Sequence, residues 1–544
     1  MLPRRLSCLT ALALLAACAR SAPSAPAVPT NVLLVTLDTT RADRIGRGFT
    51  PTLDRLAAQG LRFTEARTAV PLTLPAHVSI MTGLPPTRHG VRLNGEGRSA
   101  IDFTIAAELK NRGYATRAVV GAFVLDRRFG LDAGFDEYDD HIARNPESTD
   151  LLEAERPANE VVDRAVAVLE ALPADKPWFL WVHLYDAHAP YQPPAAALAR
   201  AGGDPYNGEI AFVDGELGRL FARVDARSDA ARTATIAVGD HGESLGEHGE
   251  STHGMLLFEP AIRVPLIIKW PGMAPTERRD AAGVDDIART ISNHARGIAP
   301  IGSTNQVHDK PEGRDWGMGR DLFQPVPETV EAFSETDYPT LVGWSSVRAL
   351  VNGRWKMVLS SRAQLFDLAT DPDEQTDVSA AQAALAKSME ANLVATNRSL
   401  EQSTKRSPAT GSLPADTAAR LQSLGYVAAT RPAAAPPKSE ALDPATVMAD
   451  WAAFEAALAD VTAGQSATAV PVLARLAKKF PDSPLFAATY ARALSAGGRK
   501  REALERFRAA VATWPTDSSL YHELAVAARE SGLAVEALRA EQAS

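Results

Sequence analysis

The chain has 544 residues, of which 45% are hydrophobic and 23% charged, so it is long enough for several domains and has the composition of an ordinary folded protein. Its 57 lysines and arginines against 66 acidic residues give a net charge of −9, which argues against binding to nucleic acid or anionic membranes through overall charge. The two cysteines, Cys8 and Cys18, exclude a disulfide framework or a cysteine metal site further along the chain.

The N-terminal segment predicts export. Residues 1–17 combine two arginines with a short apolar run, as in a secretory signal peptide. The sequence Leu-Ala-Ala-Cys that ends at Cys18 resembles a bacterial lipobox, where cleavage before the cysteine leaves a thiol to be lipidated. A plain signal peptide with an incidental cysteine is the alternative. Residues 18–29 then predict a flexible tether, so we expect an exported lipoprotein anchored to a membrane of the bacterial cell envelope.

The next part of the chain predicts an α/β fold with a mainly parallel sheet. Three apolar runs are typical of strands buried on both faces: they span residues 32–37, 178–185 and 233–239. The runs are followed by Asp38, Asp186 and Asp240. Open α/β sheets carry their ligand sites at the carboxyl ends of the strands, so three such ends predict a functional site. A single aspartate there would more often be a cap or turn residue.

A helix is predicted between these strands, with Thr73 as a suitable N-cap and Gly83 at its end. A hydroxyl at a helix N-terminus faces free backbone N–H groups and the positive end of the helix dipole, which suits an anionic ester. Periodicity alone favours the alternative, a cap without a chemical role.

Histidines gather in one part of the chain, where they predict a metal site. Five of the eleven lie within 71 residues: His183, His188, His241, His248 and His253. With Asp240 and neighbouring glutamates they supply the imidazole and oxygen ligands that zinc, manganese and similar ions prefer.

These segments resemble the sulfatase branch of the alkaline phosphatase superfamily. The similarity runs from about residue 31 to residue 426, and its most specific motifs are Asp-His-Gly-Glu from Asp240 and Thr-Gly-Leu-Pro-Pro-Thr-Arg-His-Gly from Thr82. The resemblance implies a catalytic domain over residues 30–428 with an alkaline-phosphatase-like sandwich fold.

The chain departs from the sulfatases at the nucleophile. Their Cys- or Ser-x-Pro-x-Arg signature, whose first residue is oxidised to formylglycine, is replaced here by Thr73 and His77 at the two ends, so no formylglycine is expected. The Gly-Lys-x-His pair is also missing at residues 120–123. Thr73 is similar instead to the threonine nucleophile of nucleotide pyrophosphatase/phosphodiesterases and lipoteichoic-acid-synthase-like enzymes, and Asn94 falls where the former bind phosphate.

The resemblance implies that Asp38, Asp240 and His241 hold a divalent metal ion, with the Thr73 oxygen as a further ligand. Coordination lowers the pKa of the hydroxyl, so Thr73 can attack phosphorus and form a covalent ester that water or an alcohol releases. The Asn94 amide and the backbone N–H groups after Thr73 are expected to stabilise the phosphoryl oxygens. Histidine among the ligands favours zinc or manganese over calcium.

A second metal ion is left open. Asp186, His188 and His253 are candidates to hold it; otherwise a one-metal site has His188 and His253 acting on the substrate directly. His77, one helical turn beyond Thr73, is a candidate substrate-binding residue, with packing as the alternative.

The C-terminal part predicts a small all-α domain. Residues 429–446 have a Pro- and Ala-rich linker composition. In residues 447–544, Gly464, Gly498 and Gly532 recur every 34 residues, and the segment resembles tetratricopeptide repeats. The expected role is binding of a protein partner on a concave surface, and a packing or dimerising cap is the alternative.

The sequence thus predicts an exported metal-dependent hydrolase or transferase that cleaves phosphoester bonds through Thr73. The alternatives are a sulfuric ester hydrolase and a catalytically silent scaffold that works through its repeats. A full set of site residues argues against the scaffold, because a silent domain has no physical need for it: Asp38, Thr73, Asn94, Asp240 and His241.

Overall fold

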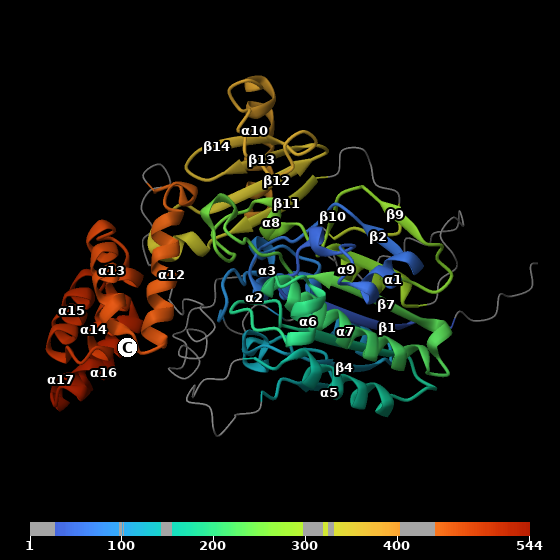
Figure 1. The fold of residues 1–544 in the computed structure, drawn as a ribbon, viewed down its shortest axis with the longest axis horizontal. Coiled ribbons are helices and arrows are strands. Elements are labelled where there is room, and N and C mark those ends of the chain that lie inside the picture. Colours follow the sequence, from blue (N-terminus) through green and yellow to red (C-terminus); the bar gives the residue numbers. More distant parts are fainter. Residues whose placement is uncertain are drawn as a thin grey trace, which may run out of the picture.

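The computed structural model describes most of the chain, namely residues 28–96, 101, 103–142, 155–296, 319–324, 331–402 and 441–544. They form a large α/β domain, a smaller four-stranded sheet and a C-terminal array of helices (Figure 1). The predicted signal peptide, most of the tether and the boundary at residue 428 lie outside these residues. Within them, no helix is both long and apolar enough to cross a bilayer.

The large domain is built on an eight-stranded sheet with the order β5-β4-β6-β1-β7-β8-β2-β9. Its strands are β1 (Asn31–Leu37), β2 (Leu61–Phe63), β4 (Ala115–Val119), β5 (Glu137–Asp139), β6 (Trp178–Leu184), β7 (Thr233–Gly239), β8 (Leu266–Lys269) and β9 (Thr276–Arg278). β8 runs antiparallel to both of its neighbours, and the other strands run in one direction. The three predicted strands are adjacent, β6-β1-β7, and the mainly parallel sheet is confirmed.

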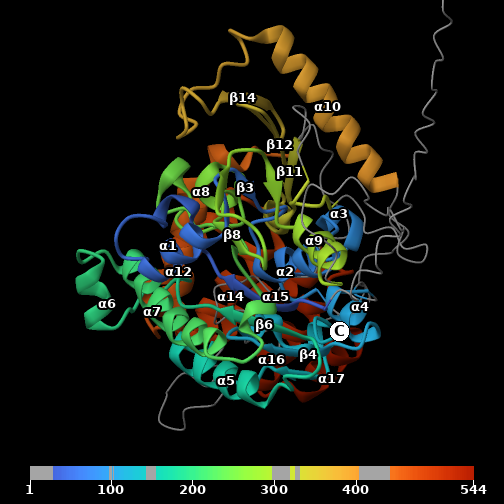
Figure 2. The ribbon, with the colours of Figure 1, turned by 90° about the vertical axis from the view of Figure 1, so that its right-hand side faces the viewer.

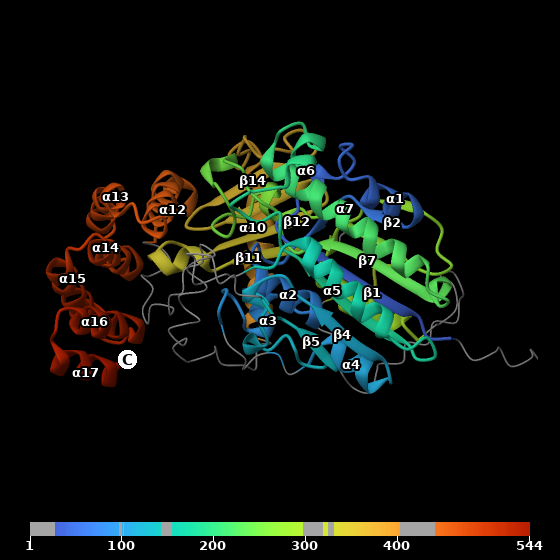
Figure 3. The same cartoon turned by 60° about the horizontal axis from the view of Figure 1, so that its bottom comes forward.

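Helices cover both faces of this sheet. One face carries α1 (Pro51–Gln59), α5 (Ala158–Ala171) and α7 (Pro205–Asp225), and the other α2 (Thr73–Thr82), α4 (Ile105–Asn111) and α9 (Asp286–His294). Figure 3 shows α5 and α7 side by side. Along β1, Leu33 and Val35 pack against the first set, whereas Val32 and Leu34 pack against the second, since successive side chains of a strand point to opposite faces. The unbroken apolar run follows from this double burial.

The smaller sheet is antiparallel, with the order β11 (Glu331–Thr336), β12 (Val347–Asn352), β13 (Trp355–Leu359) and β14 (Ala363–Asp367). Helix α10 (Ala383–Gln402) lies across it (Figure 2), and Met389 and Leu393 pack onto Leu350 and Met357. The short elements that remain are β3 (Ala66–Arg67), β10 (Ala282–Gly283), α3 (Pro86–His89), α6 (Ala195–Arg200) and α8 (Glu259–Ile262).

The C-terminal array consists of helical hairpins. Its helices are α12 (Met448–Thr462), α13 (Ser466–Lys479), α14 (Pro484–Ala496), α15 (Lys500–Thr513), α16 (Ser518–Glu530) and α17 (Ala534–Ala543). Gly464, Gly498 and Gly532 lie in successive turns with φ of 74°, 78° and 77°, a left-handed conformation that favours glycine. The predicted all-α domain is present; its membership of the tetratricopeptide repeats stays a prediction.

Candidate metal and catalytic site

Two of the three strand-ending aspartates come together at the carboxyl edge of the sheet. Asp38 follows β1 and Asp240 follows β7, its parallel neighbour. Ligand atoms of Asp38, Asp240 and His241 all lie within 4.8 Å of one another, and all three residues are buried. Among the residues that the structure describes, this is the one group of at least three such side chains so placed.

The environment of this group fits a metal ion. Two buried carboxylate oxygens, Asp38 Oδ1 and Asp240 Oδ2, have no hydrogen-bond partner in the described part of the chain. Their only ion-pair partners there are histidines, not arginine or lysine. Burial raises the pKa of both carboxyl groups well above its usual value, and the charge of Asp38 adds to the rise at Asp240. A divalent cation would compensate this buried negative charge.

His241 presents one defined nitrogen to the two carboxylates. Its Nδ1 lies 3.0 Å from the carbonyl oxygen of Gly242, which can only accept, so Nδ1 carries the proton. Nε2 lies 3.4 Å from Asp240 Oδ2 and 3.8 Å from Asp38 Oδ1. Metal-binding histidines usually have such support at the nitrogen that faces away from the ion.

The hydroxyl of Thr73 lies at the edge of the same group. Leu72 occupies the cap position of α2 and Thr73 is the first helical residue, so the predicted N-cap role of Thr73 is wrong. Its Oγ1 instead lies 3.3 Å from His241 Nε2 and interacts with the carboxylate of Asp38. The structure therefore brings the predicted nucleophile to the predicted metal ligands.

The backbone N–H groups after Thr73 are already paired. That of Leu74 donates to Asn94 Oδ1 at 2.9 Å, the next residue is a proline, and that of Ala76 donates within the first turn of the helix. The expectation that these groups stabilise a substrate oxygen is therefore wrong. Asn94 itself holds Oδ1 towards α2, and its buried Nδ2 has no partner among the described residues, which leaves a donor beside Thr73.

His77 is engaged entirely inside the protein. Its Nδ1 donates to the carbonyl oxygen of Thr73 at 2.7 Å, and its Nε2 lies 2.9 Å from Thr36 Oγ1. Thr36 accepts the indole N–H of Trp181 at 3.0 Å, so its hydroxyl proton is directed to His77. With no exposure and both nitrogens used, His77 supports the first turn of α2, and the structure does not bring it to the substrate side.

His253 and His188 lie on the more exposed side of the group. The ring centroid of His253 is 4.4 Å from that of His241 and 5.2 Å from that of His188. Nδ1 of His253 contacts Glu243 Oε1 at 2.9 Å, so Nε2 is the outer nitrogen of this ring. Nδ1 of His188 donates to the carbonyl oxygen of Ala189 at 2.7 Å, so Nε2 of His188 carries the lone pair. Burial lowers the pKa of both rings to about 3, which keeps them neutral near pH 7.

Asp186 does not join the group. Its Oδ1 accepts the N–H of Ala158 at 2.9 Å, at the N-terminus of α5, where a carboxylate stabilises a helix. Burial raises the pKa of Asp186 to about 7. The placement favours the one-metal alternative, in which His188 and His253 are close to the substrate.

Two residues of the site lie in the predicted histidine cluster and motif but were given no role of their own. His183 accepts the N–H of Gly121 at Nδ1 (3.4 Å), so its Nε2 donates to Asp38 Oδ2 at 3.2 Å and orients that carboxylate. Glu243, which contacts His253, is the last residue of the Asp-His-Gly-Glu motif. His183 could have been found from its register, because it pairs with Thr36 on β1, two residues before Asp38.

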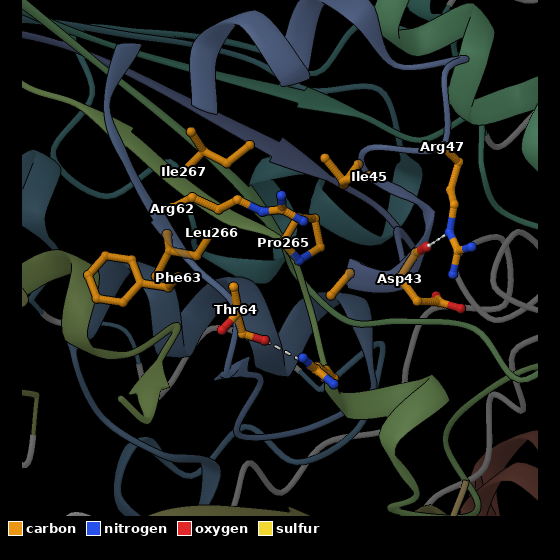
Figure 4. Close-up of a pocket in the computed structure, with 11 residues that line it drawn as sticks. Asp43, Ile45, Arg47, Arg62, Phe63, Thr64, Pro265, Leu266 and Ile267 are labelled. Atoms are coloured by element: carbon orange, nitrogen blue, oxygen red, sulfur yellow. Dashed lines mark hydrogen bonds between the residues drawn. The ribbon is translucent and has the colours of Figure 1, made fainter. Parts of the chain in front are cut away.

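A separate pocket of 240 Å³ lies near the start of β8. Figure 4 shows Ile45, Arg62 and Pro265 around it. None of the candidate site residues lines this pocket, so the predicted chemistry lies elsewhere.

Comparison with known proteins agrees with this geometry. Residues 30–298 match the family model described as Sulfatase. This part of the chain is similar to the sulfatase family. The family is metal-dependent, in accord with the group formed by Asp38, Asp240 and His241.

Individual sulfatases are similar to this chain over most of their own length. The arylsulfatase of Clostridium perfringens is 24% identical over 448 residues, which cover 64% of this chain and 90% of that protein. The choline-sulfatase of Rhizobium meliloti is 25% identical over 64% of this chain and 82% of its own length. The structure of the phosphonate monoester hydrolase of Agrobacterium radiobacter has a TM-score of 0.56 at 20% identity, over 68% of this chain and 96% of that one. The large domain, with its mainly parallel central sheet, thus has the same fold as that solved structure.

Proposed function

We propose that the chain is a metal-dependent hydrolase or transferase that cleaves phosphoester bonds through a covalent ester on Thr73. The observation that carries the proposal is the position of Thr73 Oγ1, 3.3 Å from His241 Nε2 at the edge of the carboxylate group. Oxidation of a threonine would give a ketone rather than the aldehyde of formylglycine, so the hydroxyl itself must serve as the nucleophile.

The residues around Thr73 supply the parts of such a reaction. A divalent ion held by Asp38, Asp240 and His241 would lower the pKa of the Thr73 hydroxyl and make it a nucleophile near neutral pH. Attack of Oγ1 forms a bond to phosphorus and releases the substrate alcohol, which takes up a proton. Water or a second alcohol then breaks the Thr73 ester and loses its proton, which restores the hydroxyl.

The remaining residues bind the substrate and handle protons. The Nδ2 of Asn94, which has no hydrogen-bond partner among the described residues, would donate to a phosphoryl oxygen, where negative charge grows during attack. The outer nitrogen of His253 is supported by Glu243 behind its Nδ1, the arrangement that orients a general acid or base. His188 stacks on Tyr185 with ring centroids 4.5 Å apart, which fixes its ring beside His253.

The test compares aryl phosphomonoester, phosphodiester and sulfate substrates that share one leaving group. Wild type is expected to turn over phosphoesters, and Thr73→Ala to lose this activity by about 10³-fold or more. Thr73→Ser is the matched control, since it keeps a hydroxyl and should keep part of the activity. Full turnover in Thr73→Ala, or no bound metal in wild type, would overturn the proposal.

A sulfuric ester hydrolase is the second candidate. It is favoured by the arylsulfatase and choline-sulfatase among the relatives. A sulfate ester offers Thr73 and Asn94 a similar tetrahedral centre with one charge less than a phosphate monoester. Thr73-dependent turnover of the sulfate substrate alone would select this activity, and absence of both metal and turnover would select the silent scaffold.

We also propose that the protein is an exported lipoprotein of the bacterial envelope, anchored through Cys18, and that residues 447–544 bind a protein partner. The Leu-Ala-Ala-Cys sequence supports the first proposal, and the helical hairpins with 34-residue spacing support the second. Labelling of growing cells with a fatty acid tests the anchor, because Cys18→Ala should lose the label.

A further inference from the structure

The C-terminal array is fixed to the large domain by a shared apolar core. This core joins Trp451 and Phe454 of α12 to Tyr338 and Trp344, which lie between β11 and β12, and it also includes Leu72 and Met255 of the large domain. The ring centroids of Trp451 and Tyr338 are 5.7 Å apart, and those of Trp451 and Trp344 are 6.3 Å apart. α12 is therefore held in one position relative to the candidate site.

The loop that carries His253 lies next to α12 and is closed on itself. The N–H of Ser244 donates to the carbonyl of Thr252 at 2.7 Å, and that of Gly246 donates to the carbonyl of Glu250 at 2.9 Å. Because His253 follows Thr252 directly, the position of its ring depends on how this loop is held.

One side chain of α12 reaches this loop. The hydroxyl of Thr252 donates to Glu455 Oε1 at 2.9 Å, and the buried Oε2 has no hydrogen-bond partner among the described residues. At the start of the helix, Met448 approaches the loop so closely that a Cβ on Gly249 would lie 3.2 Å from its Cβ. α12 thus touches the loop at two points, one polar and one apolar.

Burial of the Glu455 carboxyl group lowers the stability of the fold, so packing alone does not explain this residue. Burial raises the pKa of its carboxyl group to about 7 although the Thr252 hydroxyl and the nearby indole of Trp451 lower it, and the charge of Glu243 adds to the rise. A partly buried acid with one carboxylate oxygen shut off from water is seldom the most stable choice, and an apolar side chain of similar size would fill the place at lower cost.

We propose that Glu455 is a positioning residue of the catalytic site, which fixes Thr252 and through it the ring of His253 beside His241. The C-terminal helical domain then contributes one side chain to a site whose other residues all lie within residues 30–298. The effect on turnover rests on the proposed function of His253, whereas the support of the loop does not.

Four variants separate positioning from packing. Glu455→Leu and Thr252→Val remove the hydrogen bond, while Glu455→Gln and Thr252→Ser keep an acceptor and a donor and serve as matched controls. On the ester that wild type turns over, the first pair should lower kcat about tenfold with little change in KM and unchanged metal content. In a His253→Ala background, Glu455→Leu should have no additional effect, because it acts through that ring.

Hydrogen exchange of residues 244–256 gives a readout that needs no substrate. Glu455→Leu and Thr252→Val should exchange faster there than wild type, with β1 and β7 unchanged. A lower thermal midpoint with unchanged kcat, or unchanged exchange in the loop, would overturn the inference. If wild type turns over no ester, faster exchange in both variants would keep Glu455 as the support of the loop while the proposed function fails.

Discussion

At the scale of single residues, the directions of the hydrogen bonds around Thr73 show what each neighbouring side chain does. The chain of donors from Trp181 through Thr36 to His77 ends at the carbonyl oxygen of Thr73 and holds the start of α2. Asn94 binds the next N–H of the helix with its oxygen, which turns its nitrogen to the other side. A fixed backbone and a fixed donor are what preorganised stabilisation of an oxyanion requires.

Substitution Asn94→Asp separates these two tasks of Asn94. The aspartate keeps an oxygen for the N–H of Leu74 but replaces the donor by a second oxygen. We expect kcat/KM to fall by about 10²–10³-fold, the usual loss for one oxyanion donor, with a small change in thermal midpoint. Steady-state kinetics and a melting curve measure the two effects, and full activity of Asn94→Asp would show that the substrate does not use this nitrogen.

At the scale of elements, the carboxyl ends of β1 and β7 bring two buried carboxylates together, and the repulsion between them lowers the stability of the folded state. Removal of the metal with a chelator should lower the thermal midpoint, because a ligand that binds the folded state stabilises it by mass action. Zinc or manganese should restore the midpoint. Asp240→Asn is the control: it should lose bound metal and respond little to the chelator. Equal midpoints of wild type with and without chelator would contradict the assignment of the ligands.

The loop after β7 should make stability depend on pH through Glu250. This buried carboxyl accepts the N–H of Met255 at 2.7 Å, and burial raises its pKa from 4.5 to about 8. The folded state therefore holds the proton of Glu250 more tightly than the unfolded state. The stabilisation that this proton gives the folded state is complete below pH 4.5 and is lost as the pH rises towards 8. Thermal midpoints should fall over this range in wild type and fall less in Glu250→Gln. Parallel curves for the two proteins would contradict the prediction.

At the scale of the whole molecule, the sequence predicts what depends on local pattern. The strands β6, β1 and β7 follow from uninterrupted apolar runs, and the meeting of Asp38 with Asp240 follows from parallel neighbours. The position of Asp186 could not be predicted in this way, because it depends on where α5 begins. Glu455 could not be predicted either, since its partner Thr252 lies 203 residues away and only the packing of α12 joins them.

The junction between the large domain and the smaller sheet contains a fully buried cation. Nζ of Lys356 lies 2.7 Å from Glu374 and 3.1 Å from Glu259, which also pairs with Arg67 at 2.8 Å. Removal of one partner from a buried ion pair typically costs about 3–5 kcal/mol, because the other charge stays buried. Burial raises the pKa of Glu374 to about 7, so its carboxyl group can take up a proton when the cation is lost, and this limits the cost to about 3 kcal/mol.

Lys356→Met keeps the apolar stem and removes the charge, so we expect the thermal midpoint to fall by about 4 °C. The double variant Lys356→Met/Glu374→Gln should regain part of this loss, because no unpaired carboxylate then remains in the junction. Melting curves of wild type, the two single variants and the double variant measure the coupling. Independent effects of Lys356→Met and Glu374→Gln would contradict the prediction, because they would show that these two charges do not stabilise the junction as a pair.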